Sequence, residues 1–203
     1  MNIKFHQPNA EIFTPKQIPV GQALSLTTHM AISAHQDDIE IMAASPILAC
    51  FQNPDLWFSG VVLTDGRGSA REDIYQDFTD EEMRAVRLKE QKKAAVIGEY
   101  TAQVLLDYPS SAIKDPTDER VIEDLVEIFK VASPDYVYTH NLADKHDTHV
   151  SSVLRVVEAI RSFPMENRPK KLYGCEVWRS LDWLDDQEKV AFDLSKFENL
   201  QNA

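Results

Sequence analysis

The chain of 203 residues is 43% apolar and 27% charged, which is enough for one sizeable core and short for two independent domains. Its formal net charge of -12 argues against nucleic acid or an anionic membrane surface as a partner, because either would require clustered lysine and arginine. Two isolated cysteines make neither a disulfide framework nor a thiolate zinc cluster, and no apolar run approaches a membrane span. We therefore expect a cytoplasmic domain whose partner is a small molecule; assembly into a homo-oligomer is compatible with the sequence.

Residues 1–22 are expected to form an irregular N-terminal arm, because Pro8, Pro15 and Pro19 interrupt them. A single domain is expected over residues 23–203. Within it, apolar runs of strand length alternate with longer helical patterns. The predicted strands are residues 30–34, 57–63, 103–106, 136–139 and 172–177.

Helices are predicted over residues 37–51, 79–98, 118–132 and 147–163. The first is apolar nearly all round, with a kink or restart at Ser45-Pro46, and the second opens with the capping-box pair Thr79 and Glu82. Residues 199–203 continue a helical pattern without a capping signal, which leaves open that the chain is truncated there. The alternation of strand and helix predicts an α/β fold, a Rossmann-like three-layer sandwich with a mostly parallel central sheet.

Two clusters of imidazole and carboxylate groups follow predicted strands. His35, Asp37 and Asp38 come after the strand at residues 30–34, and the run Asp144 to His149 comes after the strand at residues 136–139. Active sites of parallel α/β sheets lie beyond the carboxyl ends of the strands, so both clusters are expected at the same edge. Together they predict one mononuclear metal site.

The residue types suit a catalytic zinc ion, which takes three protein ligands from His and Asp or Glu and leaves one position for water. His35 and Asp38, with one histidine of the second cluster, supply that count. Asp37 is then a free carboxylate that can accept the proton of the water. Iron(II), cobalt or manganese would also fit such ligands, so another divalent metal remains an alternative.

Five stretches together resemble the PIG-L/LmbE-like family of zinc-dependent de-N-acetylases, and the resemblance spans about residues 30 to 180. They are Ala34-His35-Gln36-Asp37-Asp38, Thr64-Asp65-Gly66-Arg67-Gly68, Arg87-x-x-Glu90, Pro134-Asp135, and Asp144 followed by His146-x-x-His149. The resemblance implies a hydrolase that removes an N-acetyl or related acyl group from an amino sugar or glycoconjugate. The products would be acetate and a free amine.

The resemblance also implies roles for single residues. His35, Asp38 and His149 would be the zinc ligands, Asp37 the general base and then the general acid, and His146 the group that stabilises the oxyanion. Arg67 lies where family members contact substrate hydroxyls or a phosphate, and Arg71 is a second candidate for that contact.

The chain departs from the family pattern in both motifs. Gln36 stands in place of the usual proline and Ile39 in place of the usual glutamate, while the second motif has Asp147-Thr148 where the family has Pro-Asp. The protonation of His146 would then depend on Asp144 or Asp147. An alternative function follows, namely a catalytically impaired family member that binds metal and sugar as a binding or sensor module.

Several residues have structural interpretations beside the functional ones. His140 fits a hydrogen-bonded structural histidine, close enough to the site to support a ligand. Arg87 and Glu90 fit a surface ion pair as well as a site role. Trp178 and Trp183 fit core packing or a sugar-stacking platform. The run 64–68 fits a plain turn or a phosphate cradle, but without the glycine spacing of nucleotide-binding loops a nucleotide-binding function has little support.

Overall fold

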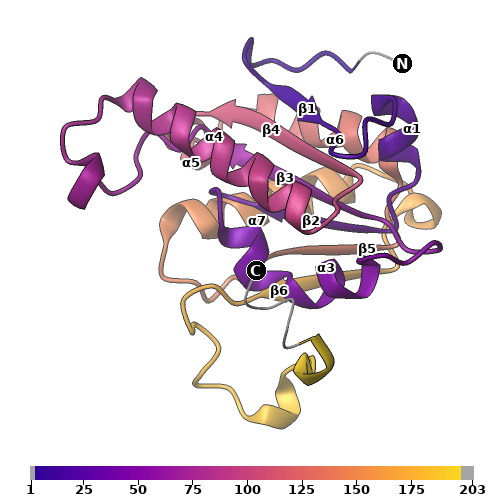
Figure 1. The fold of residues 1–203 in the computed structure, drawn as a ribbon. Coiled ribbons are helices and arrows are strands. Elements are labelled where there is room, and N and C mark those ends of the chain that lie inside the picture. The colour runs from indigo at the N-terminus through magenta and orange to yellow at the C-terminus, as the bar shows by residue number, and fades with distance from the viewer. Residues whose placement is uncertain (1–2, 198–203) are drawn as a thin grey trace.

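The structure is a computed structural model that describes residues 3–197, so the helical pattern predicted over 199–203 lies outside it (Figure 1). Its centre is a six-stranded sheet in the order β1-β4-β3-β2-β5-β6. Strands β2 to β6 are parallel to one another, and β1 is antiparallel to β4. The strands are β1 (Glu11–Phe13), β2 (His29–Ser33), β3 (Phe58–Thr64), β4 (Ala102–Tyr108), β5 (Tyr136–His140) and β6 (Lys171–Cys175).

Helices cover both faces of this sheet. They are α1 (Val20–Ser25), α2 (Asp38–Met42), α3 (Ala44–Cys50), α4 (Asp80–Ile97), α5 (Ser110–Lys114), α6 (Arg120–Ala132) and α7 (Asp147–Arg161), with short 3-10 turns at Asp73–Tyr75, Met165–Asn167, Asp186–Glu188 and Ser195–Phe197. Among the described residues, none of these helices combines the length and the apolar character that crossing a membrane requires.

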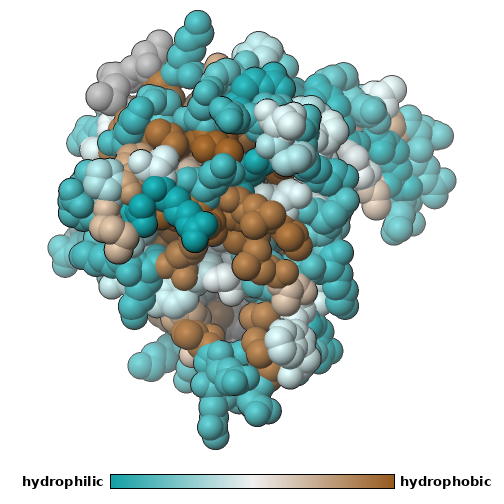
Figure 2. All heavy atoms as spheres, turned by 180° about the vertical axis from the view of Figure 1, so that it is seen from behind, coloured by the Kyte–Doolittle hydropathy of each residue, from teal (hydrophilic) through white to brown (hydrophobic). Residues whose placement is uncertain are grey.

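Two hydrophobic cores lie on opposite faces of the sheet, which confirms the predicted three-layer α/β fold. Because side chains alternate along a strand, Met30 and Ile32 of β2 pack with α1, α6 and α7, whereas Ala31 packs with α2, α3 and α4. The surface seen from behind is mainly hydrophilic, with hydrophobic residues gathered near its centre (Figure 2). Most of the apolar side chains that the structure describes in its strands are buried in the two cores.

The sheet order places the two predicted clusters side by side. Strand β2 lies at the centre of the sheet, with β3 hydrogen-bonded on one side and β5 on the other. The chain leaves β2 toward β3 and returns much later to β5, so a crevice forms at the carboxyl ends of β2 and β5. Residues separated by more than a hundred positions thus meet at one point.

The prolines predicted an irregular arm over residues 1–22, but part of this segment is regular. Glu11–Phe13 form β1 at the edge of the sheet, and α1 begins at Val20. The strand forms between Pro8 and Pro15, where three consecutive residues keep their backbone N–H groups for pairing with β4. Ile12 and Phe13 also pack against the two cores, so apolar burial adds to the backbone pairing.

The helix predicted over residues 37–51 is two helices. The break falls at Ala43, which has φ -121° and ends α2 before α3 begins. Pro46 then sits in the first turn of α3, where its missing N–H costs no helical hydrogen bond. The predicted capping box of α4 is confirmed, with the Thr79 hydroxyl accepting the Glu82 N–H.

A buried carboxylate fastens the N-terminal segment to the sheet. Asp124 on α6 is fully buried and accepts hydrogen bonds from Tyr108 Oη at 2.7 Å and from the His6 backbone N–H at 3.2 Å; His6 Nδ1 is 2.8 Å from the same carboxylate. We expect Asp124→Ala to lower the free energy of unfolding by about 3 kcal/mol, because it leaves the buried Tyr108 hydroxyl unpaired. Urea denaturation measures this, and Glu123→Ala is the matched control, since Glu123 is exposed and contacts only the other nitrogen of His6. Equal destabilisation by both would contradict the prediction.

Candidate active site

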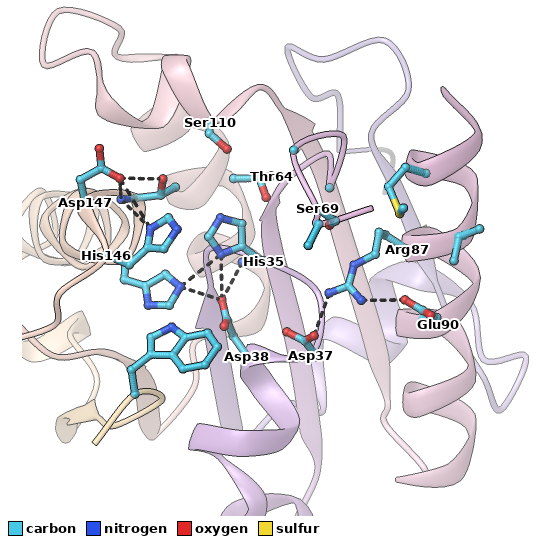
Figure 3. Close-up of a pocket in the computed structure, with 18 of the residues that line it drawn as sticks. His35, Asp37, Asp38, Thr64, Ser69, Arg87, Glu90, Ser110, His146 and Asp147 are labelled. Carbon is cyan, nitrogen blue, oxygen red and sulfur yellow. Dashed lines mark hydrogen bonds and ion pairs between the residues drawn. The ribbon is translucent and has the colours of Figure 1, made fainter. Parts of the chain in front are cut away.

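Three side-chain donor atoms meet beyond the carboxyl ends of β2 and β5 (Figure 3). His35 Nδ1 lies 3.1 Å from His149 Nε2, and Asp38 Oδ2 lies 3.4 Å from each of these nitrogens. His35 comes from the turn after β2, Asp38 from the start of α2, and His149 from the first turn of α7. Asp38 is held there by the His35 backbone N–H, which donates to Asp38 Oδ2 at 2.8 Å.

The spacing of these atoms fits a tetrahedral metal site. Zinc bonds to nitrogen and oxygen are about 2.0–2.1 Å long, so neighbouring donors around a tetrahedral ion are about 3.3 Å apart. The three observed separations, 3.1, 3.4 and 3.4 Å, lie close to this value. Three protein ligands on one ion leave a fourth position for water or substrate.

Lone pairs distinguish the candidate ligands from the other imidazoles. Metal-sized groups of donor atoms can also be drawn through His140 or His146. His140 Nε2, however, accepts the Ala34 backbone N–H at 2.8 Å, and His146 Nδ1 accepts the Thr148 N–H at 3.2 Å. Those lone pairs are occupied, which favours His35, Asp38 and His149. His140 stacks on His149 with ring centroids 3.9 Å apart and thereby supports it, as a neighbouring structural histidine would.

Asp144 orients His149. Its Oδ2 lies 3.1 Å from His149 Nδ1, and both side chains are almost fully buried. A hydrogen bond at Nδ1 fixes the ring so that Nε2, the other nitrogen, faces Asp38. The second carboxylate oxygen of Asp144 accepts the His146 N–H at 2.9 Å, so one aspartate shapes the whole start of α7.

We expect Asp144→Ala to weaken zinc binding roughly 10- to 100-fold, the usual effect of removing the partner that orients a ligand. Competition with a chromogenic chelator measures the dissociation constant. Asp147→Ala is the matched control, because the Asp147 carboxylate is exposed and pairs with Lys114 instead of His149. Similar affinities for the two variants would contradict the role given to Asp144.

The electrostatics keep Asp38 and His149 ready to bind a cation. Burial opposes ionisation of Asp38, but the adjacent imidazoles of His140, His35 and His149 outweigh burial and hold its pKa well below the ordinary value. Burial lowers the pKa of His149, and the neighbouring His140 lowers it further. At neutral pH the site therefore offers a carboxylate and a neutral imidazole, and protons compete with a metal only in acid.

Asp37 lies beside these atoms without joining them. It precedes α2 in a left-handed conformation, φ 78° and ψ -27°, and this turn of the backbone directs Asp37 and Asp38 apart. Its carboxylate is 62% exposed and faces the pocket, with Arg87 Nη2 2.8 Å from Oδ2. Arg87 also pairs with Glu90, so the i, i+3 pair exists and Arg87 has a site contact as well.

His146 is half exposed at the N-terminus of α7 and lines the same pocket. Because its Nδ1 accepts the Thr148 N–H, the neutral ring carries its proton on Nε2. That N–H is a donor for an oxygen in the pocket. The unusual Asp147-Thr148 pair of the second motif therefore still defines the tautomer of His146, through the backbone.

The pocket has a volume of about 660 Å³. Trp178 lines it, whereas Trp183 does not and donates its indole N–H to the Ser180 carbonyl. Neither Arg67 nor Arg71 is among the lining residues. Arg67 pairs with Asp65 and Glu81, and Arg71 pairs with Asp80 and bonds three loop carbonyls, so both hold the 65–80 loop; substrate contact by either stays a prediction.

Sequence reasoning did not single out Lys114 and Ser110, which line the pocket from α5. The five-residue helix is too short for a periodic signal, and its position depends on packing against α7. The one available signal was position: Ser110 and Lys114 directly follow β4, and active-site residues of parallel sheets gather after the carboxyl ends of the strands.

The comparison with protein-family models matches residues 30–160 to the family described as PIG-L, GlcNAc-PI de-N-acetylase. The chain belongs to the PIG-L family. The match contains the turn after β2 and the start of α7, and so includes all three converging donor atoms. The curated proteins searched contain no match to this family member.

Solved structures share the fold of this PIG-L family chain at low identity. An N,N'-diacetylchitobiose deacetylase from Pyrococcus horikoshii is 17% identical with a TM-score of 0.66, over 86% of this chain and 66% of that one. The pseudoaglycone deacetylase Dbv21 is 15% identical with a TM-score of 0.58, over 81% and 69%. A 4-carboxy-2-hydroxymuconate hydratase, GalB from Pseudomonas putida, is 19% identical with a TM-score of 0.57, over 73% and 62%. The fold thus serves more than one reaction.

Proposed function

We propose that this PIG-L family chain is a metal-dependent hydrolase that removes an N-acetyl or related acyl group from an amino sugar or glycoconjugate. The observation that carries the proposal is the convergence of His35 Nδ1, Asp38 Oδ2 and His149 Nε2 at separations of 3.1–3.4 Å, with a further carboxylate, Asp37, facing the same pocket. Zinc suits this donor set, and the three residues are its proposed ligands.

Each group has one task in the proposed reaction. A bound zinc ion would supply a Lewis acid and lower the pKa of a water molecule toward neutrality. Asp37 accepts a proton from the attacking water and later delivers it to the departing amine nitrogen, so that acetate and a free amine result. His146 Nε2–H donates to the amide carbonyl oxygen as that oxygen gains negative charge.

The proposed substrate class rests on the family and on the pocket. Two of the solved structures with this fold are named as deacetylases, one of diacetylchitobiose and one of a pseudoaglycone. The pocket adds an exposed indole, Trp178, on which the apolar face of a sugar ring can lie. Oligomeric state and cytoplasmic location stay predictions of the sequence.

We expect Trp178→Ala to raise KM for an N-acetylated sugar roughly 2- to 10-fold with little change in kcat, because stacking on a ring contributes about 0.5–1.5 kcal/mol. Steady-state kinetics separate the two constants. Trp183→Ala is the matched control, since that indole is more exposed but lies outside the pocket. A kcat loss for Trp178→Ala at unchanged KM would contradict a platform role.

The direct test is acetate release. Protein loaded with one zinc per chain is incubated with N-acetylglucosamine, N,N'-diacetylchitobiose and glycoside derivatives, and acetate is measured enzymatically. Release that stops with a chelator and returns with zinc supports the proposal. Zinc-loaded protein that binds these sugars without releasing acetate would instead support the alternative, a catalytically impaired binding module. Water addition to an unsaturated acid without acetate would support a hydratase like the GalB structure.

A further inference from the structure

One buried glutamine contacts the backbone of the proposed catalytic base. Gln91 on α4 is 1% exposed, and its Oε1 accepts the Asp37 backbone N–H at 3.1 Å. Its amide nitrogen donates to Glu40 Oε1 at 2.9 Å and to Gln103 Oε1 at 3.3 Å. Gln91 lines no part of the pocket, so it can act on the reaction only through Asp37.

The same peptide unit is held from its other side. Arg87, one helical turn before Gln91, donates from Nη2 to the Gln36 carbonyl oxygen at 2.5 Å. The Gln36 carbonyl and the Asp37 N–H belong to one planar peptide group, and fixing both ends of a plane fixes its orientation. Helix α4 therefore clamps the peptide from which the Asp37 side chain departs.

These contacts stabilise an unfavourable backbone conformation at Asp37. Asp37 has φ 78°, a left-handed conformation that a residue other than glycine adopts at a cost of roughly 1–3 kcal/mol unless its surroundings hold it. The side chain of Asp37 is 62% exposed, so packing does not hold it. The contacts of the peptide from Arg87 and Gln91, together with the Arg87 ion pair, do so instead.

Gln91 is itself held in one orientation. Glu40 Oε1 accepts the Gln91 amide at 2.9 Å and also the hydroxyl of the fully buried Tyr100 at 2.6 Å. The Glu40 carboxylate accepts from the amide nitrogen of Gln91, which leaves the amide oxygen of Gln91 to accept the Asp37 N–H. The series of hydrogen bonds that runs from Tyr100 through Glu40 to Gln91 thus ends at the Gln91 amide oxygen, which accepts the Asp37 N–H.

We propose that Gln91 is a positioning residue that sets the direction of the Asp37 carboxylate by accepting the Asp37 N–H. This inference rests on the proposed function, in which Asp37 is the base. A carboxylate that is free to turn is misplaced for proton transfer, and misplacement by about 1 Å costs on the order of 100-fold in rate. Loss of the clamp should therefore lower kcat and leave KM unchanged.

The test compares three variants loaded with zinc. Gln91→Met keeps the shape but removes the acceptor, and kcat for acetate release should fall on the order of 10- to 100-fold at unchanged KM and zinc content. Gln103→Met removes a buried amide that touches Gln91 but neither Asp37 nor the pocket, so it should reduce stability without that kcat loss. In the double variant Gln91→Glu with Glu40→Gln, residue 91 still accepts the Asp37 N–H and residue 40 becomes the donor to residue 91. Its kcat should therefore be close to that of the wild type and above that of Gln91→Met.

A second readout does not depend on turnover. Amide hydrogen exchange of Asp37, followed by NMR, should accelerate in Gln91→Met and not in Gln103→Met. If the wild type releases no acetate but shows this difference, the proposed function fails while the clamp stands. If Asp37 exchange is unchanged in Gln91→Met, or kcat falls equally in both methionine variants, Gln91 is a structural residue and the inference is overturned.

Discussion

Replacing His149 by alanine should abolish stoichiometric metal binding and, with it, acetate release. Among the described residues, His149 belongs to the proposed set of ligands and also to the two other metal-sized groups, which contain His140 or His146, so each candidate set includes it. The loss of affinity should exceed the roughly 100-fold that removing an orienting partner can cost. Metal analysis of protein purified without chelators measures the zinc content per chain.

A paired comparison decides which other imidazole binds the metal. His35→Ala should lose zinc, whereas His140→Gln should keep it, because a glutamine retains an acceptor for the Ala34 N–H that His140 now receives. His35 is partly exposed, so its replacement should disturb the fold less than a change at the fully buried His140. Zinc retained by His35→Ala and lost by His140→Gln would mean that Asp38, His140 and His149 form the site.

Asp37→Asn should lower kcat roughly 10²- to 10⁴-fold while the zinc content stays at one per chain. The amide cannot accept the proton of water, yet asparagine tolerates the left-handed conformation found at this position. The Gln91 and Arg87 contacts to the backbone should therefore persist. Steady-state kinetics together with metal analysis test both parts of this expectation.

Glu90→Gln is the control for the loss of a charge near Arg87. Glu90 pairs with the same guanidinium at 2.7 Å and lines the pocket, but it lies away from the three converging donor atoms (Figure 3). Its kcat should change far less than that of Asp37→Asn. Equal losses would show that the charge balance around Arg87, and not a base at Asp37, controls the rate.

Local patterns in the sequence predicted the positions of most strands and of the start of the longest helix. Apolar runs located the bounds of β2 to β6 within two residues, and the Thr79–Glu82 pair located the start of α4. These features depend on neighbours within a few positions, and such signals are readable from a linear chain. The first and second motifs likewise pointed to His35, Asp38 and His149, whose side chains lie together in the structure, while their role as ligands stays a prediction.

Local patterns did not predict the short elements. Strand β1 has three residues and α5 has five, and each depends on contacts with distant parts of the chain, β4 for the former and α7 for the latter. Too few residues are present for a period to appear. The break at Ala43 was also misplaced by three residues from Pro46, because the end of α2 is set by how it packs on the sheet.

The sequence by itself determined which chemistry the chain carries, since imidazoles and paired aspartates at strand ends are local facts. Only the tertiary structure decided which of these groups are occupied by hydrogen bonds and which lie open to the pocket. The lone pairs of His140 and His146 are taken by backbone N–H groups, Arg67 and Arg71 are used within their own loop, and Gln91 reaches Asp37 from another helix. Hydrogen-bond partners depend on distances between segments far apart in the chain, and those distances exist only after folding.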